Sequence, residues 1–225
     1  IAATLTGFAI FMDYLDEKKI TDNPIVIFMS DNGGLSVSRR AGEPHTHNRP
    51  LNSGKGSAYE GGIRVPMIVK WPGKVNPGTK TNKMVIIEDF FPSILEIARV
   101  NEYTTVQTVD GKSFIPLLLN PEKETETRDL FWHFPNNWGP TGPGIGATST
   151  IRSGEWKLIY YYRDQHFELF NIPEDIGEQN NMADKFPEKV DKLAGKLGTY
   201  LRSVDAQRPV FKSTGQPVPW PDKTK

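Results

Sequence analysis

Two stretches decide the fold of this chain: IVIFMSDNGG at residues 25–34 and GKGSAYEGGIRVP at residues 54–66. The first begins with five consecutive apolar residues at 25–29, most of them β-branched or aromatic. An uninterrupted run of this kind predicts a strand that is buried on both faces in a parallel sheet. Ligands of open α/β sheets bind beyond the carboxyl ends of such strands, so residues 31–34 are expected to form half of a binding site.

Asp31 and Asn32 place a carboxylate and a carboxamide oxygen directly after this strand. Such oxygens are ligands for a hard cation, calcium or magnesium, and poor ligands for zinc or copper. Asp-Asn-Gly-Gly is also favourable turn chemistry, and residues 35–38 alternate as a returning hairpin strand would. The residues alone leave the metal site and the turn equally open.

Lys55 lies between Gly54 and Gly56, with the hydroxyl of Ser57 nearby. Glycine lets the backbone pack closely against a ligand, so this arrangement indicates a cation that is presented to an anion. A nucleotide-binding P-loop is excluded, because that motif requires a glycine at position 49 and a Ser or Thr directly after the lysine. Arg49 and Gly56 occupy those two positions.

Glu60 and Arg64 flank Gly61 and Gly62 in the second stretch. The two charged side chains are predicted to form an ion pair that shapes the loop under the site. The glycines are expected to provide tight packing or a positive φ. We interpret this pair as structural and not as catalytic.

The two stretches, followed by KWPG at 70–73, resemble the type I sulfatase family of formylglycine-dependent calcium enzymes, which includes the arylsulfatases. The resemblance implies that Asp31 and Asn32 are ligands of one calcium ion that binds the sulfate group, with further ligands upstream. It implies a catalytic role for Lys55, whose ammonium would contact the sulfate ester and stabilise the leaving group. A divalent cation and a fixed point charge suit the negative charge that develops on sulfate oxygens.

The resemblance also implies a fold. Residues 1–120 are expected to form the C-terminal part of an alkaline-phosphatase-like α/β sandwich domain, and residues 129–225 a small α+β subdomain with an extended tail. Beyond a charged linker at 120–128, the sequence predicts short strands and then a helix that opens at Pro187. The helix has an apolar stripe, expected to pack on an antiparallel sheet, that consists of Val190, Leu193, Leu197 and Leu201.

The family's nucleophile motif, Cys or Ser followed by x-Pro-Ser-Arg, does not occur in this sequence. Apolar residues recur at helical spacing over residues 5–15 without a preceding cap, which predicts that the chain starts within a domain. The resemblance therefore implies that the formylglycine lies in an upstream half of the same protein. On this interpretation the isolated chain is inactive.

His47 is a candidate substrate contact between the two stretches, in HTHN at 45–48. Histidines at i and i+2 share one face of a strand, so a zinc site at His45 and His47 is an alternative, although no third ligand is apparent nearby. An exposed loop is the simpler interpretation. The resemblance instead implies that His47 or Asn48 touches the leaving alcohol.

Trp138 is the candidate for stacking on a sugar ring, because it lies in a Gly/Pro-rich loop. Trp132 is expected to pack in the core. His133 is expected to be a neutral, hydrogen-bonded partner of its neighbours.

Composition excludes several function classes. The chain has 27 Lys+Arg and 27 Asp+Glu, so no net charge favours nucleic acid as a partner, and any recognition of an anion is local. The absence of cysteine excludes disulfides and thiolate metal sites. No apolar run is long enough to span a membrane. The compartment does not follow from the residues, and a periplasmic or extracellular location is an expectation from the family.

The sequence thus predicts the C-terminal part of a sulfatase that hydrolyses sulfate esters, with a sulfated small molecule or carbohydrate as substrate. One alternative is a non-catalytic carbohydrate-binding, anion-binding or partner protein of sulfatase descent. Another is a phosphodiesterase of the alkaline phosphatase superfamily. That enzyme would need two metal ions held by Asp and His side chains, and the residues supply no clear second metal site.

Overall fold

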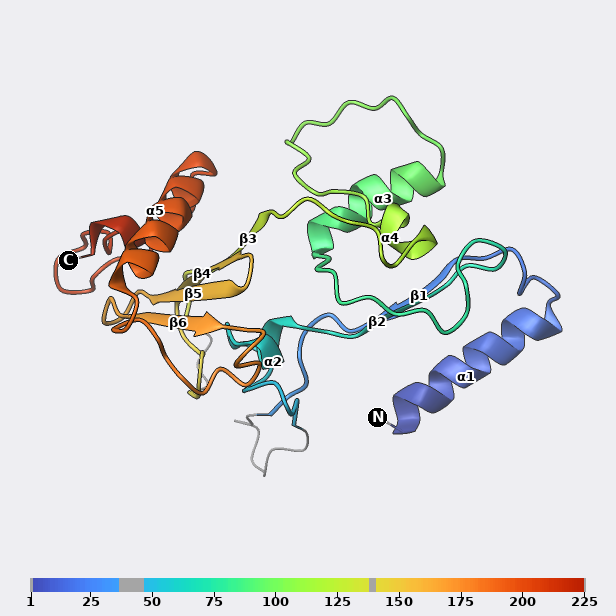
Figure 1. Cartoon of the computed structure of the whole chain (residues 1–225), viewed down its shortest axis with the longest axis horizontal. Coiled ribbons are helices and arrows are strands. Elements are labelled where there is room, and N and C mark those ends of the chain that lie inside the picture. The colour runs from blue at the N-terminus through green and yellow to red at the C-terminus, as the bar shows by residue number, and fades with distance from the viewer. Residues whose placement is uncertain (1, 37–46, 138–140, 225) are drawn as a thin grey trace. The chain divides into compact units, whose positions relative to one another are not determined.

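The computed structural model describes residues 2–36, 47–137 and 141–224. The chain forms two compact units, each assembled from two separate pieces. Ile1–Met29 and Met67–Glu126 make the first unit, and Ser30–Pro66 and Thr127–Lys225 make the second (Figure 1). The second stretch of the sequence therefore belongs to the same unit as the C-terminal part of the chain.

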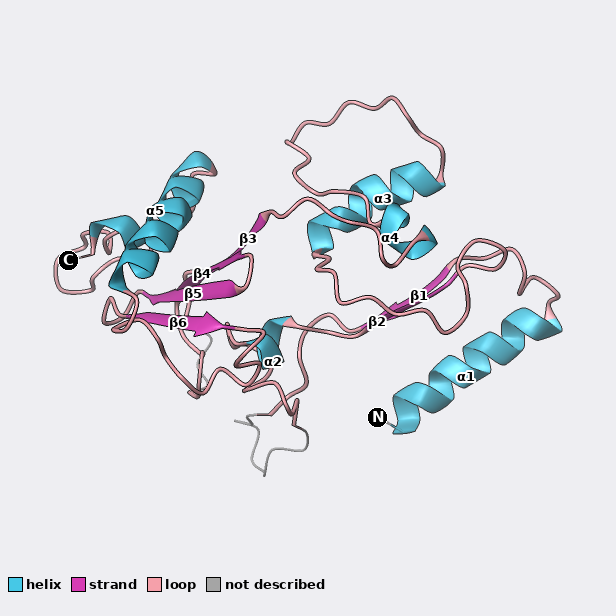
Figure 2. Ribbon diagram, viewed as in Figure 1, coloured by secondary structure: helices cyan, strands magenta, loops and turns pink. Residues whose placement is uncertain are grey.

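The first unit contains a long helix, two shorter helices and a two-stranded sheet (Figure 2). Its elements are α1 (Ala2–Glu17), β1 (Val26–Met29), β2 (Met67–Lys70), the 3-10 helix η1 (Ile87–Asp89), α3 (Phe90–Ile97) and α4 (Ile115–Leu119). The ring of Phe8 in α1 lies 4.9 Å from the ring of Phe28 in β1. This contact joins the helix to the strand that carries the first stretch.

The strand predicted at 25–29 is present as β1, but its surroundings differ from the prediction. In the part of the chain that the structure describes, β1 pairs with β2 alone, and the pair is antiparallel, with Val26 opposite Lys70. All four residues of β1 are half-buried. The prediction of a strand buried within a parallel sheet is wrong for these residues, because a single neighbouring strand borders β1.

The second unit is built on a four-stranded antiparallel sheet whose strands follow the chain order. The strands are β3 (Asp129–Phe134), β4 (Thr148–Ser153), β5 (Trp156–Tyr161) and β6 (Phe167–Asn171). The helices are α2 (Glu60–Ile63), α5 (Pro187–Ser203) and the 3-10 helix η2 (Pro221–Lys223). The predicted antiparallel sheet with a packed helix is confirmed, and α5 begins at the predicted proline.

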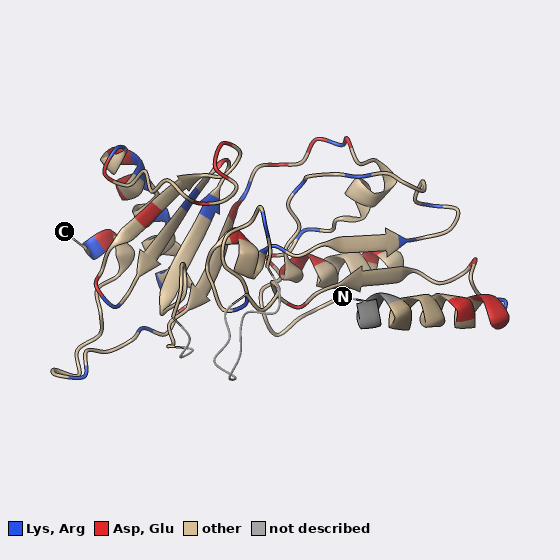
Figure 3. Cartoon of the chain, turned by 90° about the horizontal axis from the view of Figure 1, so that it is seen from below, with Lys and Arg blue, Asp and Glu red and all other residues tan. Residues whose placement is uncertain are grey.

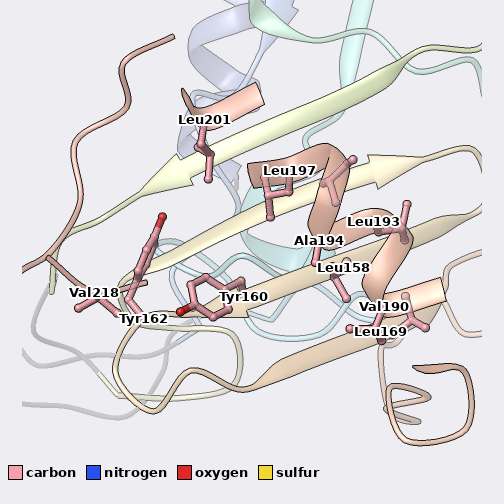
Figure 4. Close-up of a cluster of buried hydrophobic side chains, with 11 residues drawn as sticks. Leu158, Tyr160, Tyr162, Leu169, Val190, Leu193, Ala194, Leu197, Leu201 and Val218 are labelled. Atoms are coloured by element: carbon pink, nitrogen blue, oxygen red, sulfur yellow. The ribbon is translucent and has the colours of Figure 1, made fainter. Parts of the chain in front are cut away.

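The side chains of β5 alternate between two covered faces of this sheet. On one face, Leu158 and Tyr160 pack against α5 (Figure 4). The packed stripe of α5 contains the four predicted residues, Val190, Leu193, Leu197 and Leu201. On the other face, Ile159 packs with Phe170 and with Tyr59 of the second stretch. The second stretch therefore packs on the face of the sheet that is opposite to α5.

The domain boundaries predicted at 1–120 and 129–225 stay a prediction. The sheet of the second unit starts at Asp129, close to the predicted boundary. Residues 30–66, which fall in the first predicted domain, pack with the second unit. The two units and the two predicted domains therefore divide the chain differently.

Charged residues of both signs are interspersed along the two units (Figure 3). This distribution agrees with the equal numbers of acidic and basic residues, 27 each. Among the described residues, no helix combines the length and the apolar character that a membrane span requires.

We expect Leu197→Ala to lower the free energy of unfolding by about 2–5 kcal/mol, because it opens a cavity between α5 and the sheet. Leu197 is 0% exposed, and urea denaturation measures the effect. Val204→Ala, just beyond α5 where the side chain is 51% exposed, is the matched control. It should change stability by less than about 0.5 kcal/mol. Equal losses in the two variants would contradict the role of α5 as the core helix.

Candidate functional site

The two stretches meet through their backbones in the second unit. The amide of Gly33 donates to the carbonyl of Gly62 at 2.9 Å, and the amide of Lys55 donates to the carbonyl of Gly34 at 3.1 Å. The two predicted metal ligands directly precede the first of these contacts. The structure thus brings these ligands and the loop that carries Lys55 to one place, which we call the crossing.

Glycine is required at the crossing because no space is left for a side chain. A Cβ atom on Gly33 would lie 1.7 Å from the carbonyl oxygen of Gly61, and one on Gly54 would lie 2.2 Å from that of Gly34. A Cβ atom on Gly61 would in turn lie 2.0 Å from the carbonyl oxygen of Asn52. The tight packing expected of the glycines is confirmed, and it fixes the distance between the two backbones.

The polar side chains at the crossing are available to ligands. Asp31 and Lys55 are exposed and Asn32 is half-buried, and none of the three side chains bonds to another described residue. The carboxylate and carboxamide oxygens at 31–32 are donors of the kind that calcium binds. Within the described ranges, no three or more His, Asp or Glu side chains gather as a metal site. The residues present therefore fit part of a calcium site, and the remaining ligands would come from elsewhere.

Asn48 connects the two segments with its side chain. Its carboxamide oxygen accepts a hydrogen bond from the amide of Gly34 at 2.9 Å, and its nitrogen donates to the carbonyls of Gly34 and Ser53 at 3.0 and 2.8 Å. Asn48 is thus a structural brace of the crossing, a role that the sequence does not reveal.

The other candidate substrate contacts are only partly described. His47, next to Asn48, is exposed. His45 and Trp138 lie outside the described residues, so the zinc alternative and the sugar-stacking role stay predictions.

A buried ion cluster of Glu60, Lys157 and Glu178 anchors the second stretch to the sheet. The ammonium of Lys157 lies 3.0 Å from Oε1 of Glu60 and 2.8 Å from Oε1 of Glu178. The side chains of Lys157 and Glu178 are 0% exposed, and that of Glu60 is 12% exposed. The contact to Glu178 Oε1 is an ion pair outside hydrogen-bond geometry, whereas Oε2 accepts a hydrogen bond from the amide of Glu60 at 2.6 Å.

Two carboxyl groups share one ammonium in this cluster. Burial raises the pKa of Glu178 to about 7, and the positive charge of Lys157 opposes the rise. A buried net negative charge is unfavourable, which is why one carboxyl group holds a proton more tightly than usual. Glu60 also lies 3.9 Å from the guanidinium of Arg64, so the predicted ion pair is confirmed.

The sequence analysis missed Lys157 and Glu178. Lys157 stands within the apolar strand WKLIYY, and a lysine in such a run is the one signal that indicates a buried charge with a partner. No local pattern identifies the partner, because Glu60 precedes Lys157 by 97 residues.

Tyr59 anchors the same loop beside the cluster. Its ring packs edge to face on Phe170, with 5.5 Å between ring centroids. Burial, and then the carboxylate of Glu168, raise the pKa of Tyr59 and of Tyr161. The hydroxyl of Tyr161 donates to Glu168 at 2.6 Å. The two phenols are therefore neutral groups that hold the loop in place.

His133 bonds through both ring nitrogens. Nδ1 lies 2.7 Å from Oγ of Ser149, and Nε2 lies 2.7 Å from the carbonyl oxygen of Gln207. Burial lowers the pKa of His133, which favours the neutral ring. The predicted hydrogen-bonded role is confirmed. Trp132, expected in the core, is half-buried.

Comparisons with protein families match both stretches. A family described as "N-sulphoglucosamine sulphohydrolase, C-terminal" matches residues 54–207, and a family described as "Sulfatase" matches residues 7–100. A "Sulfatase" of Formosa agariphila is 35% identical over 217 residues, which cover 91% of this chain and 37% of the relative. An "N-acetylgalactosamine-6-O-sulfatase" of Bacteroides thetaiotaomicron is 30% identical over 206 residues, or 83% of this chain and 38% of the relative. The chain spans about two fifths of the length of these curated relatives.

A solved structure has a similar fold. The crystal structure of Ps i-CgsB in complex with k-i-k-neocarrahexaose superposes with a TM-score of 0.70 and 27% sequence identity. The superposition covers 87% of this chain and 40% of the other.

We expect Gly33→Ala to lower the free energy of unfolding by more than about 1 kcal/mol, because the added methyl group overlaps the carbonyl of Gly61. Gly195→Ala in α5 adds the same methyl group where no atom lies within 4 Å. That control should raise stability by up to about 1 kcal/mol, because alanine favours a helix over glycine. Urea denaturation measures both. A Gly33→Ala variant as stable as the parent would show that the crossing is looser than described.

The raised pKa of Glu178 predicts a pH-dependent contribution to stability. Between pH values of about 4.5 and 7, the folded state holds the Glu178 proton and the unfolded state has released it. The stability that Glu178 contributes is therefore complete at the acidic end of this window and is lost as the pH rises through it.

The free energy of unfolding of the parent chain relative to Glu178→Gln should accordingly fall from pH 5 to pH 8 (roughly the ends of that window) in urea denaturation. An advantage of the parent that grows with pH would contradict the raised pKa.

Proposed function

This chain belongs to the sulfatase family, and from that premise we propose that it supplies the sulfate-binding part of an active site that hydrolyses sulfate esters of carbohydrates. The family match includes both stretches on which the resemblance was based. The fold class, an alkaline-phosphatase-like α/β domain with a small α+β subdomain, agrees with the solved relative. The activity, substrate and partners of the whole protein are parts of the proposal, because the chain covers about two fifths of its relatives.

The crossing is the observation that carries the proposal. Its backbone hydrogen bonds, Gly33 to Gly62 at 2.9 Å and Lys55 to Gly34 at 3.1 Å, hold the segment that carries Lys55 next to the segment that follows Asp31 and Asn32. On this proposal, the positive charge and the metal ligands, which come from separate stretches, act on one bound sulfate ester. A protein that binds only uncharged carbohydrate would not need this combination.

Hydrolysis of a sulfate ester breaks a bond between sulfur and the ester oxygen, and the leaving alcohol gains negative charge as that bond breaks. We assign to the ammonium of Lys55 the stabilisation of this charge, because the backbone of Lys55 is bonded to Gly34 at the crossing and its side chain is bonded to no other described residue. Asp31 and Asn32 would hold a calcium ion together with further ligands. When bound, calcium supplies positive charge to the sulfate oxygens.

The names of similar proteins support the proposed substrate class. The Bacteroides relative is named for a sulfated amino sugar, and Ps i-CgsB was solved with a neocarrahexaose. We assign a sulfated carbohydrate to this chain on that basis. His47, which is exposed beside the crossing, and Trp138 are the proposed contacts to the sugar.

Lys55→Ala and Asp31→Ala should each lower sulfate release from sulfated oligosaccharides by roughly 100- to 1,000-fold in the intact protein, because each removes charge stabilisation at the reacting group. Ion chromatography of free sulfate measures the rate. Lys196→Ala is the control. This lysine lies in α5, on the opposite face of the sheet from the second stretch, and pairs with Asp129 at 2.8 Å. Unchanged rates in Lys55→Ala would refute the catalytic role of Lys55.

Calcium titration of the 225-residue chain tests the metal ligands separately. We expect weak or absent binding, because the chain supplies only part of the ligand set. Tight binding that Asp31→Ala does not weaken would contradict the assignment.

A further inference from the structure

The buried cluster of Glu60, Lys157 and Glu178 is not used by the proposed chemistry, yet it ties together three distant segments. Glu60 lies 97 residues before Lys157 and 118 residues before Glu178. We propose that the cluster positions the loop of Lys55 against the oxygen donors at 31–32, so that its three members are positioning residues for sulfate binding. The inference rests on the proposed function of Lys55.

The cluster is linked to the crossing through a short run of backbone. Glu60 opens α2, and the next two residues make contacts of the crossing: Gly61 donates to the carbonyl of Asn52 at 2.9 Å, and Gly62 accepts from the amide of Gly33 at 2.9 Å. Because a Cβ atom has no room at Gly33, the two backbones touch without a compressible side chain between them. A shift of α2 is therefore transmitted to residues 31–34 and is not absorbed.

The chemistry of the cluster favours positioning over stability as its role. Removing three charged groups from water costs free energy that their attraction returns only in part, and apolar residues of the same size often stabilise a core equally well. An ion pair instead specifies where individual atoms lie. Here one ammonium, 3.0 and 2.8 Å from two carboxylates, fixes the second stretch and the segment of Glu178 to the same point of β5.

Hydrogen exchange of the full chain tests the positioning without any assumption about activity. Glu60→Gln and Glu178→Gln keep the size of the side chain and each remove one of the two carboxyl groups that contact Lys157. Both should speed exchange of the amides of Gly33 and Lys55, which bond across the crossing. Lys196→Met removes an exposed ion pair of the same unit, with Asp129, and should leave those amides unchanged.

A double-mutant cycle in the intact protein tests whether the cluster acts through Lys55. Glu60→Gln should lower kcat/KM for a sulfated oligosaccharide by roughly 10- to 100-fold, the effect of a small displacement of a catalytic group. In a Lys55→Ala background, the same substitution should lower it by a clearly smaller factor, because one of the groups being positioned is gone. A purely structural role would give equal losses in the two backgrounds.

The outcomes separate the two proposals. Equal losses in both backgrounds overturn the positioning role, as does unchanged exchange at Gly33 and Lys55 in both Glu60→Gln and Glu178→Gln. Full activity of Lys55→Ala overturns the proposed function of that lysine, and the exchange experiment then decides alone whether the cluster positions the loop.

Discussion

The close approach of Gly33 to the carbonyl of Gly61 is the constraint on which the rest of the second unit depends. With 1.7 Å between an added Cβ and that oxygen, two backbones meet where any other residue would hold them apart. Asp31 and Asn32 follow the end of one strand and Lys55 comes from a separate loop, so the two segments are brought together at the crossing. Glycine here acts through its missing side chain and not through flexibility.

Both faces of the sheet in the second unit are covered by other parts of that unit. The face of β5 with Leu158 and Tyr160 forms an ordinary apolar core with α5. The opposite face, with Lys157 and Ile159, supports the second stretch. Because side chains alternate along β5, one strand contacts α5 on one face and the second stretch on the other. The second stretch comes much earlier in the chain, since Glu60 precedes Lys157 by 97 residues.

Sequence reasoning found the parts whose signals are local. The block at 54–66, the pair of Glu60 and Arg64, and the stripe of α5 are each readable within a few residues, and the structure contains them. Among the described residues β1 pairs only with β2, in antiparallel orientation, and not in the predicted parallel sheet, because a run of apolar residues does not specify which strands border it. Glu178 and the bracing role of Asn48 were missed, since their partners are set by tertiary contacts that no nearby pattern encodes.

The long separation within the ion cluster has a consequence for synthesis on the ribosome. Glu60 emerges 97 residues before Lys157 and 118 before Glu178. At a synthesis rate of roughly 5–20 residues per second, Lys157 is made about 5–20 s after Glu60. During that interval Glu60 and a glycine-rich backbone are without their long-range partners in the nascent chain, and contacts of such long range form late in folding. The loop at 54–66 is thus made well before its partners and becomes native only after they have emerged.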